Sequence, residues 1–352
     1  MRAHRTLDVA GSLLFFTLLA VLAPGKPALA ATAEKPNVLF ILVDTLRADR
    51  VGAHGDRPSL TPFLDGFAAE SLVYERAYAP SSWTMPSIAS LFVGQLPFEH
   101  RFLDFGDRLP RDAETLAEAF RDAGVETAAF VASGTLKIGE YDRGFTTWQI
   151  VGNPVFLSNP DGTEVNAAVL EWLDGRDASW PFFAYLHYME PHVPYRAHGG
   201  VTAPRNPALS VDVTDASLSF RTAAGVREDA LERKRSWGFD ALEHERLVQL
   251  YDGEVAYLDD VLRRLFAELE TRHALDRTIV VVTADHGEAL GEHGLYSHAV
   301  SLYEPEVHVP LILRLPGDAF RGRIAMPVGT TARSPGFSVT SSAAYRSAPA
   351  SP

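Results

Sequence analysis

Five short segments of this chain are rich in apolar residues, many of them β-branched or aromatic, and each ends at polar residues. They span residues 38–43, 125–131, 182–186, 278–283 and 309–313. The segment 38–43 is a continuous apolar run, which is typical of a strand buried on both faces, such as the strands of parallel sheets. The pattern therefore predicts five core strands.

Between these segments, apolar residues recur at every third or fourth position, which is the period of a helix that packs against a sheet. Helices are expected at 85–93 and 112–124, and Thr61 followed by Pro62 marks the start of another. The longest amphipathic pattern covers residues 247–269. Strands that alternate with helices predict an α/β fold, with helices on both faces of a mainly parallel central sheet.

Residues 1–30 have the composition of a signal peptide. A basic start is followed by an apolar stretch at 12–23 and by the small-x-small site Ala28-Leu29-Ala30. The apolar stretch is shorter than the ~20 residues of an ordinary membrane span, so no stable span is expected after cleavage. An uncleaved N-terminal anchor is the alternative. Under both interpretations the domain is exported, as a periplasmic or secreted protein.

The C-terminal end has a different composition. In residues 329–352, Thr, Ser, Ala and Pro dominate and no apolar periodicity remains, which predicts a disordered tail. Residues 196–240 are also irregular and polar, as expected for a lid or a surface excursion. We therefore expect one folded domain at 37–328.

Charge and cysteine content narrow the possible functions. The net charge of −13 argues against a nucleic-acid partner, because phosphate backbones attract basic surfaces. It does not exclude an anionic substrate, since a bound cation can reverse the local sign. The chain has no cysteine, which rules out disulfides, a thiolate metal site and a thiol nucleophile.

Polar residues follow three of the predicted strands. Asp44 comes after 38–43, His187 after 182–186, and Asp285 with His286 after 278–283. We expect these side chains to lie close together, because the carboxyl ends of parallel strands lie at one edge of the sheet. Parallel sheets bind their ligands beyond that edge. Carboxylate and imidazole ligands suit Zn²⁺ or Mn²⁺ better than Ca²⁺ or Mg²⁺, which remain possible. The next residue, Gly287, is expected to let the backbone turn sharply behind these ligands.

Thr84 precedes the apolar helical segment 85–93 and has Pro86 two positions later. A hydroxyl at a helix N-terminus is either a nucleophile or a plain helix cap. A metal ion would favour the first interpretation, because coordination lowers the pKa of a bound oxygen. Two histidines could assist the reaction. His192 and His298 are candidates for ligating a second metal, binding the substrate anion or donating a proton to the leaving group.

In order and spacing, the motifs over residues 37–328 resemble the sulfatase family of the alkaline-phosphatase superfamily. The matching segments are 37–49, 83–91, Gly144-Phe145, 187–195, 250–254, 285–288 and the stretch from Leu302-Tyr303-Glu304 to Val309-Pro310-Leu311. The resemblance implies an alkaline-phosphatase-like α/β/α sandwich and a hydrolase that acts on ester bonds.

The resemblance also assigns residues. It implies that Asp44, Asp285 and His286 hold a divalent metal together with Thr84, which occupies the nucleophile position. In addition, His192 matches the family histidine beside the ester. A sixth residue, His298, lies where family members carry a lysine or histidine that contacts the transferred group.

The chain departs from the family pattern at position 84. Sulfatases convert a cysteine or serine there to formylglycine, and threonine cannot form that aldehyde, so no formylglycine is expected. Thr45 replaces the second aspartate of many sulfatases, and Ile88 replaces an arginine. Water can discharge a phosphorylated threonine more readily than a sulfated one. These differences favour a phosphate monoester, phosphate diester or phosphonate ester as substrate.

Two alternatives remain open. The chain could be an arylsulfatase-like sulfuric ester hydrolase, or a degenerate domain without catalytic activity. In either hydrolase the substrate is expected to be a small molecule or a glycan- or lipid-borne ester. Family members continue into a small C-terminal subdomain after the strand at 309–313. Its expected absence here favours the degenerate alternative, whereas the intact set of ligand types opposes it.

Overall fold

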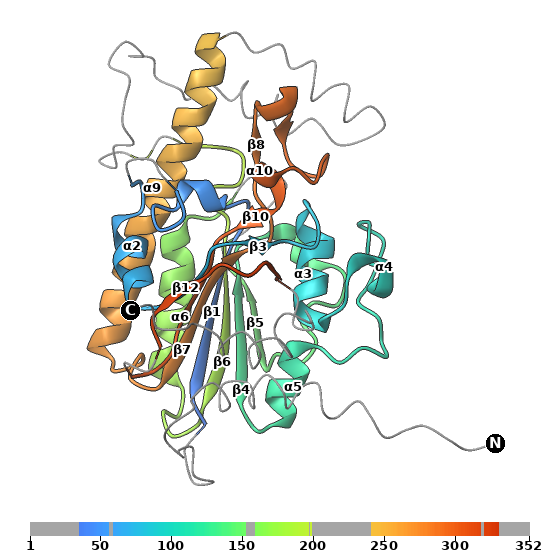
Figure 1. Ribbon diagram of the computed structural model, residues 1–352. Coiled ribbons are helices and arrows are strands. Elements are labelled where there is room, and N and C mark those ends of the chain that lie inside the picture. The colour runs from blue at the N-terminus through green and yellow to red at the C-terminus, as the bar shows by residue number, and fades with distance from the viewer. Residues whose placement is uncertain are drawn as a thin grey trace, which may run out of the picture.

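The computed structural model describes residues 35–55, 59–152, 159–196, 198, 241–317 and 320–330. A large sheet with helices on both faces dominates these residues (Figure 1). The predicted signal peptide, nearly all of the irregular segment 196–240 and residues 331–352 lie outside the described residues. Within the described ranges, no helix has both the length and the apolar character that crossing a membrane requires.

The large sheet, as far as the described residues show it, has eight strands in the order β12-β2-β11-β7-β1-β6-β4-β5. Their bounds are β1 Asn37–Val43, β2 Leu72–Tyr74, β4 Glu126–Val131, β5 Thr147–Ile150, β6 Phe182–Tyr188, β7 Thr278–Ala284, β11 Leu311–Arg314 and β12 Gly322–Ile324. Of these eight strands, β11 alone runs opposite to the others, because it pairs antiparallel with both β7 and β2. The predicted mainly parallel sheet is confirmed.

The predicted strand at 309–313 is divided in the structure. Pro310, which has no N–H for a strand ladder, separates β10 (His308–Val309) from β11. Strand β10 pairs instead with β3 (Ala77–Tyr78), and β3 pairs with β13 (Val328–Gly329). The predicted tail was expected to begin at residue 329, but that residue lies in β13.

Helices cover the sheet on both sides. On one face lie α2 (Pro62–Ala69), α6 (Gly162–Gly175) and α9 (Ala241–Thr271), and on the other α3 (Thr84–Val93), α4 (Pro97–His100) and α5 (Leu116–Asp122) (Figure 1). The short elements are α10 (Glu304–Val307), η1 (Ala48–Arg50), η2 (Gly134–Lys137), η3 (Glu292–Gly294), β8 (Ala289–Leu290) and β9 (Tyr296–Ser297).

The start predicted for α5 at residue 112 is wrong. The N-cap is Thr115, whose hydroxyl accepts the Glu118 N–H while the Glu118 carboxylate accepts the Thr115 N–H. This reciprocal capping box satisfies two backbone donors and fixes the first turn.

The strand register brings the carboxyl ends of three strands together. Val43 of β1 pairs with Ala284 of β7, so Asp44 and Asp285 leave the same edge of the sheet side by side. On the other side of β1 lies β6, which carries His187. The predicted convergence of these residues is therefore a direct result of parallel pairing.

Candidate active site

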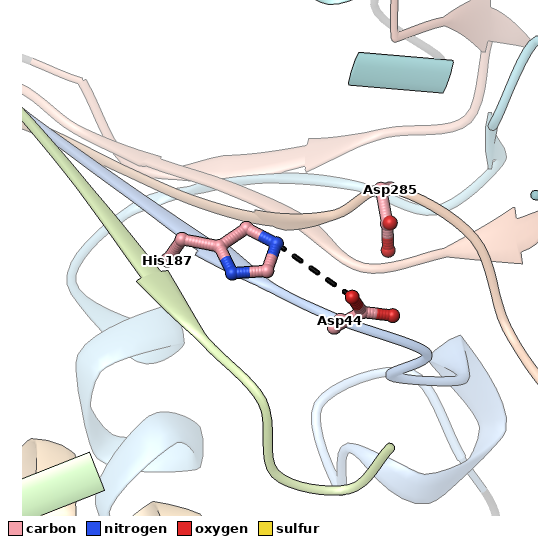
Figure 2. Close-up of side chains that lie close together, drawn as sticks. All are labelled: Asp44, His187 and Asp285. Carbon is pink, nitrogen blue, oxygen red and sulfur yellow. Dashed lines mark ion pairs between the residues drawn. The ribbon is translucent and has the colours of Figure 1, made fainter. Parts of the chain in front are cut away.

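Asp44, His187 and Asp285 form a buried cluster at the carboxyl ends of β1, β6 and β7, with His187 still inside β6 (Figure 2). Each offers one ligand atom, and these atoms all lie within 4.8 Å of one another. The His187 Nε2 is 3.6 Å from the Asp44 Oδ2. None of the three residues is more than 2% exposed.

The loop after β7 holds Asp285 in a fixed orientation. The Asp285 Oδ1 accepts the backbone N–H of Thr45 at 3.2 Å and the backbone N–H of His286 at 2.8 Å. The Asp285 carbonyl oxygen accepts the Ser87 hydroxyl at 2.5 Å, which joins this loop to the first turn of α3.

His286 links the carboxylates to Thr84. Its Nδ1 lies 2.9 Å from the Gly287 carbonyl oxygen, and because a carbonyl only accepts, Nδ1 carries the proton. In the neutral ring the lone pair is then on Nε2. This nitrogen lies 3.1 Å from the Thr84 Oγ1, 3.7 Å from the Asp44 Oδ1 and 3.4 Å from the Asp285 Oδ2.

Thr84 is the first residue of α3, and Trp83 is the N-cap. The interpretation of Thr84 as a plain helix cap is therefore wrong. Its hydroxyl is buried at the positive end of the helix dipole, an environment that favours negative charge. At the other end, α3 stops at Gly94, whose N–H donates to the Ser90 carbonyl and whose left-handed φ of 65° turns the chain out of the helix.

His192 and His298 lie beside this group. Their ring centroids are 5.1 Å apart, and the His298 ring is 4.7 Å from that of His286. The His192 Nδ1 contacts the Val193 carbonyl oxygen at 2.6 Å. Burial, followed by the neighbouring His298, lowers the pKa of His192 to about 3.

The cluster has the properties of a cation site. The Asp44 Oδ1, the Asp285 Oδ2 and both His187 ring nitrogens are buried without a hydrogen-bond partner. Burial, and then the Asp285 and Glu288 carboxylates, raise the pKa of Asp44 well above its usual range. Burial also raises the pKa of Asp285 and lowers that of His187 to about 3.

A divalent cation would offset the free-energy cost of burying these carboxylates and unpaired nitrogens. It would keep both carboxylates ionised and accept the lone pairs of neutral imidazoles, which is the protonation state that metal ligands require. The residues that could hold it are Asp44, Thr84, Asp285 and His286, as expected, and also His187. The strand-end position of His187 signalled convergence, but not a ligand role.

A search against protein-family models matches the sulfatase family over residues 36–331. The chain belongs to the sulfatase family. Iduronate 2-sulfatase of Homo sapiens is 27% identical to this family member over 337 residues, covering 82% of the chain and 61% of the relative. Arylsulfatase of Clostridium perfringens is 24% identical over 348 residues, covering 82% of the chain and 70% of the relative. The chain thus spans about three-fifths of the length of iduronate 2-sulfatase.

Solved structures show the same fold as this sulfatase-family chain. Phosphonate monoester hydrolase of Agrobacterium radiobacter matches with a TM-score of 0.65 and 20% identity, covering 84% of this chain and 71% of that one. A sulfatase from Bacteroides thetaiotaomicron, described as putative, matches with a TM-score of 0.64 and 23% identity, covering 81% and 65%. The alkaline-phosphatase-like fold expected from the sequence is confirmed.

Thr45, named above only as the replacement of a family aspartate, adjoins the cluster and has a strained backbone. Its φ is 60°, an outlier for a β-branched side chain, and its Oγ1 is buried without a hydrogen-bond partner. The Tyr251 hydroxyl donates to the Thr45 carbonyl at 2.7 Å and accepts the Arg47 N–H at 3.1 Å. Strain of this kind persists only where surrounding contacts enforce it, and it is frequent at functional sites.

The structure gives a different physical reason for a glycine at position 287 from the one that the sequence suggested. Its φ is not positive, so a sharp left-handed turn is not what requires glycine here. A Cβ at this position would lie 2.1 Å from the Pro305 carbonyl oxygen. Glycine is required because α10 approaches closely, and the Gly287 N–H donates to the Glu306 carbonyl at 2.8 Å.

Proposed function

We propose that this sulfatase-family chain is a metal-dependent hydrolase of anionic esters with Thr84 as its nucleophile. The observation that carries the proposal is the position of the Thr84 hydroxyl. It lies on a helix N-terminus, 3.1 Å from the His286 Nε2, and that nitrogen lies within 3.7 Å of two buried carboxylates. A nucleophilic hydroxyl needs this kind of environment, because threonine is a weak nucleophile at its ordinary pKa.

In the proposed reaction the Thr84 Oγ bonds to the phosphorus atom, and the bond from phosphorus to the leaving oxygen breaks. The Thr84 hydroxyl gives up its proton in this step, and the neutral imidazole of His192 or His298 takes up a proton at Nε2 and passes it to the leaving oxygen. Water then attacks the phosphothreonine, releasing the product acid and restoring the hydroxyl. The helix N-terminus favours the negative charge that develops on the transferred group. A divalent cation held by Asp44, Asp285 and His286 would lower the pKa of the Thr84 hydroxyl.

Chemistry at phosphorus is favoured because of the residue at position 84. Threonine is a secondary alcohol and cannot be oxidised to an aldehyde, so the ester formed on it must be discharged by water. The second candidate is a sulfuric ester hydrolase. It is supported by the relatives, which include iduronate 2-sulfatase and a Bacteroides thetaiotaomicron N-acetylglucosamine-6-O-sulfatase. A glycan-borne ester is consistent with both candidates.

The deciding experiment uses the purified full chain with Zn²⁺ or Mn²⁺. Turnover is compared on nitrophenyl phosphate, bis-nitrophenyl phosphate, a nitrophenyl phosphonate and nitrophenyl sulfate. The proposal expects turnover of a phosphorus ester that Thr84→Ala abolishes and Thr271→Ala, a control at the end of α9, leaves intact. Sulfate turnover that depends on Thr84 would establish the second candidate. A chain that binds no metal and turns over none of these esters would be the degenerate domain.

We also propose that the chain is exported, on the basis of the basic start, the apolar stretch 12–23 and the site at Ala28-Leu29-Ala30. The expected product begins at Ala31. N-terminal sequencing of the exported protein would give that residue if a peptidase removes the segment, and Met1 if it remains as an anchor.

A further inference from the structure

Glu288 connects several parts of the site and has no role in the reaction as described so far. Its side chain is fully buried. The Oε1 atom lies 3.0 Å from the His298 Nδ1, and the Oε2 atom accepts the Tyr195 hydroxyl at 3.1 Å. Its backbone carbonyl accepts the Arg47 Nη1 at 3.0 Å.

These contacts join two segments that carry candidate catalytic histidines. Tyr195 lies three residues after His192, and His298 lies ten residues after Glu288. The rings of His192 and His298 have centroids 5.1 Å apart. One buried carboxylate thus ties the segment after β6 to the segment after β7.

We propose that Glu288 is a positioning residue that fixes the tautomer and orientation of His298, so that Nε2 is the ring nitrogen that acts on the ester. The proposal rests on the proposed function. A carboxylate accepts the Nδ1–H, which leaves the ring proton on Nδ1 and the lone pair on Nε2, where the ring can take up the proton of the Thr84 hydroxyl and pass it to the leaving oxygen. Carboxylates that orient a catalytic imidazole act in this way in other hydrolases.

Glutamate is required because two donors must be accepted at once. The Tyr195 O–H and the His298 Nδ1–H each take one carboxylate oxygen. Glu288→Gln has nearly the same shape, but its NH2 faces one of the two partners, and where it faces His298 that ring must accept at Nδ1 and carry its proton on Nε2. Tyr195→Phe removes the hydroxyl that competes for the amide oxygen, so that the oxygen can turn to His298.

This competition separates positioning from packing. If Glu288 only filled space, the double variant Tyr195→Phe/Glu288→Gln would be at least as impaired as either single variant. If Glu288 positions His298, the double variant recovers part of what Glu288→Gln loses. Glu171→Gln, on the exposed side of α6, is the matched control.

The first test is spectroscopic and independent of turnover. Imidazole ¹⁵N spectra of the metal-loaded protein at one pH should show the His298 Nδ1–H tautomer, assigned by the loss of these signals in His298→Asn. Glu288→Gln should weaken the Nδ1–H signature, and the double variant should restore it. An Nε2–H tautomer in the wild type, or identical spectra in all variants, would overturn the proposal.

The second test measures kcat and KM on phenyl and nitrophenyl esters of the class that the wild type hydrolyses. The poorer phenyl leaving group needs a proton more, so Glu288→Gln should lower its kcat by about 10- to 100-fold with little change in KM. Nitrophenyl turnover should fall less, and the double variant should regain part of the loss. Equal losses on both esters without recovery would contradict positioning. Turnover unaffected by Thr84→Ala would instead refute the proposed function, and the tautomer spectra would still decide the role of Glu288.

Discussion

The Thr84 Oγ1 lies 3.1 Å from the His286 Nε2, although 202 positions separate the two residues in the chain. The contact exists because the N-terminus of α3 and the loop after β7 meet at one edge of the sheet. The Ser87 hydroxyl, bonded to the Asp285 carbonyl, holds the two segments together.

This contact predicts different outcomes for two substitutions of similar size at position 84. Thr84→Val keeps the volume and removes the hydroxyl, so the initial rate should fall by roughly 10³-fold or more. Thr84→Ser keeps a hydroxyl on the helix N-terminus and should retain measurable activity. Steady-state assays on the preferred ester, with thermal unfolding as a check on folding, would test this. Equal activity of the valine variant and the wild type would show that Thr84 is not the nucleophile.

His187 is expected to contribute to metal binding. Its ring nitrogens are buried without a hydrogen-bond partner, and its Nε2 lies 3.6 Å from the Asp44 Oδ2. His187→Leu should weaken Zn²⁺ binding by about tenfold or more in calorimetric titrations, by analogy with other losses around metal sites. The surface variant His293→Asn is the matched control, because that ring stacks on Tyr303 instead.

The metal-free protein provides a complementary measurement. Saturating metal at about 100 times its Kd should stabilise the wild type by about 2.7 kcal/mol, and a chelator should remove this gain. His187→Leu should be no less stable than the wild type once both are metal-free, since the substitution removes an unsatisfied buried polar group. A large loss of stability in the metal-free variant would assign His187 a purely structural role.

The buried Glu190 carboxyl should make the free energy of unfolding depend on pH. Burial raises the pKa of Glu190 from 4.5 to about 7, and one of its oxygens accepts the Gly162 N–H at 2.8 Å. Between pH 4.5 and 7 the folded protein keeps a proton that the unfolded chain has lost. The stabilising contribution is therefore complete below pH 4.5 and lost as the pH rises through 7.

The expected size of this loss is about 3 kcal/mol, from the difference between the two pKa values. Glu190→Gln should remove it, so that the variant gains stability relative to the wild type at pH 8 but not at pH 4.5. Denaturant unfolding of both proteins at each pH, in saturating metal, measures the difference. Glu171→Gln should follow the wild type at both pH values, and parallel behaviour of Glu190→Gln would contradict the prediction.

Gly287→Ala should disturb the metal-binding loop. The added Cβ would lie 2.1 Å from the Pro305 carbonyl oxygen, so the backbone must move away from α10. We expect a loss of about 1–3 kcal/mol in the free energy of unfolding, as for other overpacked sites. Zn²⁺ affinity should fall too, because His286 is the preceding residue. Gly66→Ala, where a Cβ meets nothing within 4 Å, is the control on α2.

Local sequence patterns predicted much of the fold. The apolar runs of β1, β6 and β7 identified the central strands because burial on both faces leaves few polar positions in them. The same patterns placed Asp44 and Asp285 at strand ends, and parallel pairing brings strand ends together. Element boundaries were less accurate. The capping box at Thr115 and the break at Pro310 depend on hydrogen bonds between particular backbone groups.

The sequence by itself determined the family, through the order and spacing of its motifs, and the α/β architecture, through the alternation of strands and helices. Residue type and position at strand and helix ends made Asp44, Thr84, Asp285 and His286 candidates. Only the tertiary structure decided which groups are within contact distance. Packing between segments far apart in the chain sets three features of the site. They are the strained backbone of Thr45, the ring nitrogens of His187 that have no hydrogen-bond partner, and the contacts of Glu288 with Tyr195 and His298. No local sequence pattern determines the distances between these groups. They are set by the register of the sheet and by how α3 and α10 pack against its edge.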